Sequence, residues 1–165
     1  MGNKIKIHLV TDDELPSLID WFSTNYYDNR EAAELHFAEH IDGQGATLLA
    51  THGDEIAGYV TVGISWLKKI PLIADFAVME PYQRHGLGSR LLDLAEIYIK
   101  ENLGDQVVLW VPIVSAFGPA QRLYVKRGYV PDGNGVVKEG VSVKEGEVHT
   151  FDHSLHLCLV KDLKT

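Results

Sequence analysis

Cysteine is almost absent from this chain of 165 residues, and long apolar runs are missing altogether. The single cysteine, Cys158, excludes an internal disulfide and is typical of a protein in a reducing cytoplasm. Charged residues or His interrupt every apolar stretch before it reaches membrane-spanning length, and the N-terminal segment lacks the apolar core of a signal peptide. We therefore expect a soluble, cytoplasmic protein with no membrane partner.

Positive charge is also scarce, because 15 Lys and Arg residues against 23 Asp and Glu residues leave a net charge of −8. An acidic surface repels the phosphate backbone, which excludes nucleic acid as a general partner and favours a cationic amine as substrate. Apolar residues make up 45% of the chain, an ordinary value for a globular protein, and there is no linker, repeat or low-complexity tract. The sequence therefore predicts one domain over residues 5–163.

Apolar patterning predicts an alternation of strands and helices. Strands are expected at 5–9, 46–51, 56–64, 71–78, 107–111 and 155–160, with a further sheet section that begins at 129–130. Helices are expected from 15 to about 25, at 30–41, from 87 to a stop at 104, and at 118–127. Thr11 and Glu14 have the spacing of a capping box, and residues 131–133 predict a turn. This order predicts an α/β protein (α+β in some schemes) with a mixed central sheet flanked by helices.

The most informative segment, residues 83–89, lies between the strand at 71–78 and the helix that starts at Leu87. A strand, a two-glycine turn and a helix present backbone N–H groups at the positive end of a helix dipole, which is a site for phosphate. Two common phosphate motifs do not fit. A P-loop requires Lys and then Ser or Thr after its second glycine, whereas Ser89 and Arg90 follow here, and a dinucleotide fingerprint requires glycine where Leu91 stands.

The pattern Gln-x-x-Gly-x-Gly after a strand resembles the acetyl-CoA pyrophosphate loop of the GNAT N-acetyltransferase superfamily. Residues 120–129 resemble the other recurrent segment of that family, a helix that carries Ala-x-x-Leu-Tyr and ends at Gly before an aromatic residue. The order of elements is similar too, so the resemblance covers nearly the whole chain. It implies a GNAT-like fold in which the strands at 73–78 and 107–111 splay apart to hold the cofactor.

The resemblance implies direct transfer of an acetyl group from acetyl-CoA to a primary amine, without a covalent enzyme intermediate or a metal. The acceptor would be a small molecule or a peptide, and a homodimer is compatible with this interpretation. The pantetheine arm is expected to pair with the strand, and an N–H near Val78 would polarise the thioester carbonyl. The expected cofactor-binding residues are Phe76, Ala77, Val78, Gln83, Arg84, His85, Gly86, Leu87, Gly88 and Ser89.

Tyr124 occupies the position of the tyrosine that, in many family members, gives a proton to the departing CoA thiolate. Phenol and thiol pKa values lie within about two units, so this proton transfer is not steeply uphill. The alternative is a tyrosine that only packs its helix onto the sheet. Phe117 stands where many members carry an Asn that contacts the pantetheine arm, which puts one cofactor hydrogen bond in doubt.

The general base is left open by the sequence. Some members of the family place a glutamate where this chain has Leu72, and others place one where this chain has Pro112. Asp75 is the best remaining side chain, with two alternatives: a carboxylate that hydrogen-bonds a neighbouring turn, and a water chain that acts as the base. The two missing carboxylates also support a different class of function, a regulatory module that binds acyl-CoA and catalyses little.

Candidate walls of an acceptor pocket are the aromatic residues Trp21, Tyr26, Tyr27 and Trp66, with core packing as the alternative for each. His149, His153 and His156 do not predict a metal site, because His156 points to the opposite face of a strand from the other two. Cys158 lies in an apolar strand, which favours a buried thiol over a nucleophile.

Overall fold

The computed structural model describes residues 4–164, which form a mixed sheet of eight strands. Residues 1–3, the start of the segment considered for a signal peptide, lie outside the described part. The strands are β1 (Lys6–Leu9), β2 (Ala46–His52), β3 (Glu55–Ile64), β4 (Pro71–Val78), β5 (Gln106–Pro112), β6 (Val130–Lys138), β7 (Val141–Ser142) and β8 (Leu155–Asp162). Their order is β1-β2-β3-β4-β5-β8-β6-β7, and only β4 and β5 run parallel.

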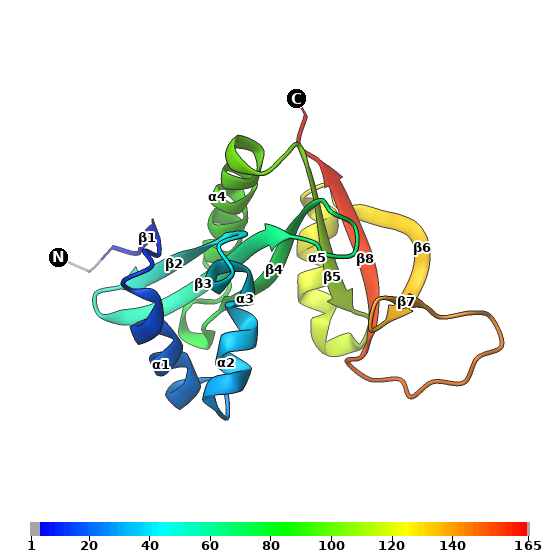
Figure 1. Cartoon of the computed structure of the whole chain (residues 1–165), viewed down its shortest axis with the longest axis horizontal. Coiled ribbons are helices and arrows are strands. Elements are labelled where there is room, and N and C mark those ends of the chain that lie inside the picture. Colours follow the sequence, from blue (N-terminus) through cyan, green and yellow to red (C-terminus); the bar gives the residue numbers. More distant parts are fainter. Residues whose placement is uncertain (1–3, 165) are drawn as a thin grey trace.

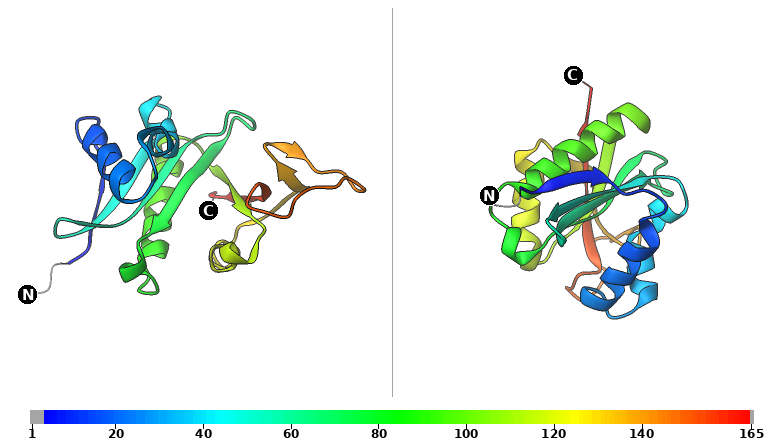
Figure 2. Two further views of the ribbon diagram at one scale, coloured as in Figure 1. Left: turned by 90° about the horizontal axis from the view of Figure 1, so that it is seen from below. Right: turned by 90° about the vertical axis from the view of Figure 1, so that its left-hand side faces the viewer.

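Helices cover both faces of this sheet (Figures 1 and 2). They are α1 (Leu15–Asn25), α2 (Arg30–His36), α3 (Ala38–Ile41), α4 (Leu87–Asn102) and α5 (Gly118–Lys126), with 3-10 turns η1 (Glu80–Tyr82) and η2 (Ser115–Phe117). Helices α1 to α3 lie on one face, and α4 and α5 lie on the other. Consecutive strand residues face opposite sides, so Leu48 joins the core under α4 while Leu49 joins the core under α1. The predicted fold class is therefore confirmed.

The capping box predicted before the first helix is present. The Thr11 N–H donates to Glu14 Oε2 at 2.8 Å, and the Glu14 N–H donates to Thr11 Oγ1 at 3.3 Å. These reciprocal bonds satisfy two backbone N–H groups just before α1 begins at Leu15.

In residues 4–164 no helix is both long and apolar enough to cross a bilayer.

The single helix predicted at 30–41 is wrong, because the chain breaks at Phe37 into α2 and α3. Phe37 leaves the helical region (φ −113°, ψ 11°), and its ring is fully buried. The ring packs 5.3 Å from Phe22 and 5.4 Å from Tyr59, between centroids. Burial of this aromatic side chain outweighs the helical pattern of the neighbouring residues.

The turn predicted at residues 131–133 is also wrong, since these residues lie inside β6. The pairing of β6 with β8 is irregular between Pro131 and Val136, where the intervening residues are unmatched in the ladder. Asp132 accepts a hydrogen bond from the backbone N–H of Asn134 at 2.9 Å, a local turn bond of the kind that Asp favours. The turn residues thus make a bulge that bends the strand rather than ending it.

The carboxylate of Asp132 joins this bulge to the loop between β3 and β4, where Lys68 Nζ lies 2.8 Å from Asp132 Oδ2. Burial alone would raise the pKa of Asp132, but the hydrogen bonds from Lys68 and Asn134 outweigh it and lower the pKa from 3.8 to about 2. Because the folded pKa lies below the unfolded one, the stabilisation is present above about pH 4 and is lost as the pH falls towards 2.

We expect Asp132→Asn to destabilise the protein by about 2 kcal/mol at pH 6 and by nearly nothing at pH 2. Urea unfolding at a series of pH values measures this difference. A destabilisation that stayed constant across the series would show that the ion pair does not contribute through the charge of Asp132.

Candidate functional site

Strands β4 and β5 diverge near the middle of the sheet (Figure 1). They pair at a single register, Leu72 with Val108, whereas β3 follows β4 along its whole length. The register of β3 and β4 shifts so that Ala74 is an extra residue, a bulge that bends β4 just after its contact with β5. The divergence opens a cavity of about 450 Å³ between the two strands, α5 and the turn before α4. The predicted splay is therefore confirmed.

The edge of β4 presents backbone groups to this cavity. The Met79 N–H donates to Ala57 O in β3 at 2.9 Å, and N–H groups alternate in direction along a strand. The N–H groups of Val78 and Phe76 therefore point towards β5, and the Phe76 N–H donates to Asp75 Oδ1 at 2.9 Å rather than to a strand. An extended molecule in the cavity could pair with this edge like a further strand.

The turn between β4 and α4 forms the outer end of the cavity. Gly86 is the N-cap of α4 in a left-handed conformation (φ 81°), and no side chain caps the helix there. The Gln83 side chain donates to Val78 O at 2.9 Å and ties the turn to the end of β4. The first-turn N–H groups of a 16-residue helix, at the positive end of its dipole, thus face an anion that enters this end of the cavity.

The two glycines of the turn have different physical roles. A Cβ atom on Gly86 would meet nothing within 4 Å, so glycine is required there by its positive φ and not by crowding. A Cβ on Gly88 would lie 3.1 Å from Phe76 Cζ, so glycine there allows α4 to approach the β4 side chain closely.

Most of the predicted cofactor-binding residues line this cavity: Phe76, Ala77, Val78, Gln83, Arg84, Gly86, Gly88 and Ser89. His85 and Leu87 do not. The His85 side chain is exposed outside the cavity, and Leu87 is a core residue with 2% exposure, so only their backbone groups belong to the turn.

Tyr124, on α5, lines the inner part of the same cavity. It is 7% exposed, with its ring centroid 6.4 Å from that of Phe76 and 5.7 Å from that of Tyr129. Burial raises the pKa of Tyr124 to about 12, so the phenol keeps its proton at neutral pH and can act as a proton donor. Phe117 lines the cavity as well and makes this wall apolar.

A second cavity, of about 540 Å³, lies on the other side of the gap between β4 and β5. It is bounded by α2 and α3, the loop between β3 and β4, and the turn between β6 and β7. Ala74, Asp75 and Trp110 line both cavities. Two molecules, one bound in each cavity, would therefore meet at these three residues.

The second cavity combines acidic and apolar walls. Glu39, Asp75 and Glu139 contribute carboxyl groups, and Trp66, 75% exposed, stands in its wall with Leu35. Of the aromatic residues expected to line an acceptor pocket, Trp66 does so. Trp21 and Tyr26 instead pack edge-on against Phe22, outside both cavities.

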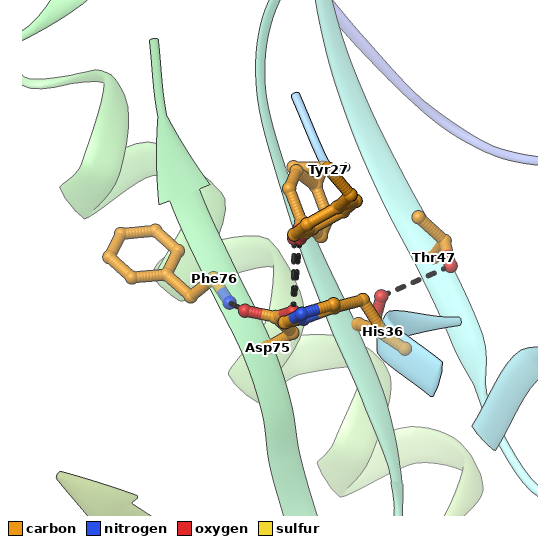
Figure 3. Close-up of polar contacts among 7 residues, drawn as sticks. Tyr27, His36, Thr47, Asp75 and Phe76 are labelled. Atoms are coloured by element: carbon orange, nitrogen blue, oxygen red, sulfur yellow. Dashed lines mark hydrogen bonds and ion pairs between the residues drawn. The ribbon is translucent and has the colours of Figure 1, made fainter. Parts of the chain in front are cut away.

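Asp75 is the centre of a polar cluster at the junction of the cavities (Figure 3). Its Oδ2 contacts His36 Nδ1, accepts from the Tyr59 hydroxyl at 3.0 Å, and lies 3.5 Å from the Tyr27 hydroxyl. Tyr27, another of the expected wall residues, stacks flat on His36 with 4.1 Å between ring centroids and an interplanar angle of 10°. Burial raises the pKa of Tyr27 and of Tyr59, so both hydroxyls keep their protons.

The site also contains His36, Glu39 and Trp110, which no pattern in the sequence predicts. His36 and Asp75 are 39 residues apart in the sequence and meet only in the folded chain, where the last residue of α2 reaches β4. A strand residue such as Trp110 has the same pattern whether it faces a core or a cavity. No local signal distinguishes these residues, so only the packed structure identifies them.

Leu72 lines the second cavity and Pro112 lines the first. Neither side chain can supply the carboxylate that the resemblance led us to consider at these positions. Within residues 4–164, no group of three or more His, Cys, Asp or Glu side chains is arranged to hold a metal ion. His149 pairs with Glu147, and His153 lies against the ring of Phe117.

Comparison with known proteins agrees with this geometry. Residues 15–129 match the acetyltransferase (GNAT) family. An N-alpha-acetyltransferase from Sulfurisphaera tokodaii is 31% identical over 105 residues, which cover 56% of this chain and 62% of that protein.

Solved structures show the same fold. An acetyltransferase of the GNAT family from Streptococcus pneumoniae aligns with a TM-score of 0.67 and 20% identity, over 96% of this chain and 99% of that one. The ribosomal-protein-S18-alanine N-acetyltransferase from Escherichia coli aligns with a TM-score of 0.68 and 16% identity, over 98% and 96% of the two chains. The chain belongs to the acetyltransferase (GNAT) family.

Proposed function

We propose that the protein is an acetyl-CoA-dependent N-acetyltransferase that moves the acetyl group directly to a primary amine. The observation that carries this proposal is the meeting of two cavities at Ala74, Asp75 and Trp110. One cavity has an anion-binding turn and an open strand edge, and the other has acidic and aromatic walls. A cofactor and an acceptor bound in this way would reach each other without a covalent enzyme intermediate.

The first cavity fits acetyl-CoA by the chemistry of its parts. The N–H groups at the start of α4 would hold the pyrophosphate, and Arg84, which lines this end, would add a charge-assisted contact. The edge of β4 at Phe76 and Val78 would pair with the amides of the pantetheine arm. The apolar side chains of Phe117, Pro119 and Leu123 would cover that arm.

The chemistry proposed for the site uses positioning and polarisation. A backbone N–H on the edge of β4 would donate to the thioester oxygen as negative charge develops there during attack by the amine. When the carbon–sulfur bond breaks, the Tyr124 hydroxyl would protonate the thiolate. Holding the amine and the thioester together supplies several kcal/mol of the reduction in the barrier.

The second cavity favours a cationic amine carried on an apolar group. Glu39, Asp75 and Glu139 attract an ammonium group, and Trp66 and Leu35 offer apolar contact. Both a small amine and the N-terminus of a peptide have this chemistry. The N-alpha-acetyltransferase among the relatives supports the N-terminus of a peptide as the acceptor.

A second candidate function is a regulatory module that binds acyl-CoA and catalyses little. It is favoured by the presence of Leu72 and Pro112 at the two positions where the resemblance implies a catalytic glutamate. Turnover distinguishes the two functions, because a module would bind CoA without releasing thiol.

The test is thiol release from acetyl-CoA by the purified protein with a panel of alkyl amines, aminoglycosides and short peptides with free N-termini. A CoA-induced rise in the melting temperature is measured in parallel. Turnover with any member supports the enzyme. A rise in melting temperature with no turnover by any amine would support the module, and neither response would refute both functions.

We expect Trp66→Ala to raise the KM for an apolar amine about fivefold to tenfold and to leave the KM for acetyl-CoA unchanged, because Trp66 lines only the second cavity. Steady-state kinetics with each substrate varied in turn measures the effect. Trp21→Ala, which removes a tryptophan outside both cavities, is the control. An equal change in both KM values for Trp66→Ala would contradict the assignment of the acceptor cavity.

A further inference from the structure

We infer that His36 is the general base that deprotonates the acceptor ammonium, with Asp75 as the residue that positions it. This inference rests on the proposed function and names a residue that supplies its missing proton acceptor. The side chain of His36 is 40% exposed and lines the acceptor cavity, next to the residues shared with the cofactor cavity.

Two contacts hold the imidazole in one orientation. Its Nδ1 atom contacts Asp75 Oδ2, and Tyr27 stacks on its face at 4.1 Å. An ionised carboxylate only accepts hydrogen bonds, so the proton of the neutral ring is on Nδ1. Nε2 is then the nitrogen with an available lone pair, and the acceptor cavity is the space that the ring lines.

Asp75 itself is poorly arranged to act as the base. Its Oδ1 accepts from the Phe76 N–H, and its Oδ2 accepts from the Tyr59 hydroxyl and contacts His36 Nδ1. Each of these groups stabilises the ionised carboxylate and occupies a lone pair that a substrate proton would need. The carboxylate is therefore suited to orienting the imidazole.

Burial of the His36 ring lowers its pKa and so favours the neutral form, which is the form that accepts a proton. The contact with the Asp75 carboxylate acts in the opposite direction and stabilises the imidazolium that forms when Nε2 takes the proton. The groups packed around it are Tyr27 and Asp75, with Tyr59 behind Asp75. Glu39, Glu139 and His156 line the same cavity.

The protons balance in the following order. Nε2 takes one proton from the acceptor ammonium, and the nitrogen lone pair then forms the bond to the thioester carbon. The carbon–sulfur bond breaks and the thiolate takes the proton of the Tyr124 hydroxyl. As the amide forms, the amine nitrogen loses a second proton, which passes through water and restores the Tyr124 phenol. The imidazolium of His36 releases its proton to solvent. The net products are amide, CoA thiol and one proton.

The experiment is the pH profile of kcat/KM for the best alkyl amine of the panel, from pH 5.5 to 9, for wild type and His36→Gln. We expect His36→Gln to lower kcat/KM for the amine about 100-fold at pH 7 and to leave the KM for acetyl-CoA within twofold of wild type. The loss should shrink towards pH 9, where more of the amine is already neutral. Asp75→Asn should lower kcat/KM for the amine about tenfold, as expected for a positioning residue. The control is His149→Gln, on the exposed loop outside both cavities, which should match wild type.

Titration of the His36 ring by NMR, without substrates, is a readout that does not depend on turnover. The ring should be neutral at pH 7 with its proton on Nδ1, and its pKa should match the acid limb of the wild-type profile. Two results would overturn the inference and leave the proposed function intact. One is a wild-type pH profile without that acid limb, and the other is a His36→Gln variant whose kcat/KM for the amine stays within twofold of wild type. A ring protonated on Nε2 would overturn it as well. Absence of turnover by wild type with every amine would instead refute the proposed function itself.

Discussion

Replacing Gly86 with valine is expected to weaken CoA binding by at least tenfold while the protein stays folded. A β-branched residue at φ 81° is strained by about 1–2 kcal/mol, and the turn can relieve that strain only by turning its N–H groups away from the pyrophosphate. The added side chain has open space around it, because nothing lies within 4 Å of the Cβ position, so the core is unaffected. Titration calorimetry with CoA measures the affinity.

Gly133→Val is a matched control for this variant. Gly133 also has a positive φ (89°) and open space around its Cβ position, but it lies in the β6 bulge and lines neither cavity. It should lower the stability by a similar amount and leave the CoA affinity unchanged. Unchanged affinity in Gly86→Val would refute the assignment of the turn as the pyrophosphate site.

Replacing Tyr124 with phenylalanine is expected to lower kcat by about 100-fold or more and to change the Kd for CoA less than twofold. The change removes the proton donor for the thiolate but keeps the ring that packs against Phe76 and Tyr129. Single-turnover kinetics and calorimetry separate the two quantities. An equal loss of kcat and of CoA affinity would show that the hydroxyl serves packing or binding and not proton transfer.

Tyr129→Phe is the control for loss of a buried hydroxyl. Tyr129 is 1% exposed and donates to Glu96 at 3.0 Å, outside both cavities. Tyr129→Phe should lower the free energy of unfolding by about 1 kcal/mol and keep the wild-type kcat. The pair of variants thus distinguishes a chemical effect from a structural one.

Much of the cofactor side of the site was predictable from the sequence, because its geometry is local. Gly86 and Gly88 lie within a few residues of both β4 and α4, so the order strand, turn, helix already determines where their N–H groups point. The helical segment around Tyr124 is short and ends at a glycine for the same local reason. The resemblance to the GNAT family then connected these two segments.

The acceptor side was not predictable, because its geometry depends on contacts between distant segments. Trp66 was named as a wall only by its residue type, and the same reasoning wrongly suggested Trp21 and Tyr26. The partnership of His36 with Asp75 requires the break at Phe37, which ends α2 where the imidazole can reach β4. That break is caused by burial of the Phe37 ring between α1 and β3, which no local pattern reveals.

By itself the sequence determined the alternation of strands and helices, the capping box and the glycine turn, since each depends on backbone geometry over a few residues. Only the tertiary structure decided the bulge at Ala74, the second cavity and the contact of His36 with Asp75. These features arise from packing between segments tens of residues apart, where burial of large side chains outweighs local preference.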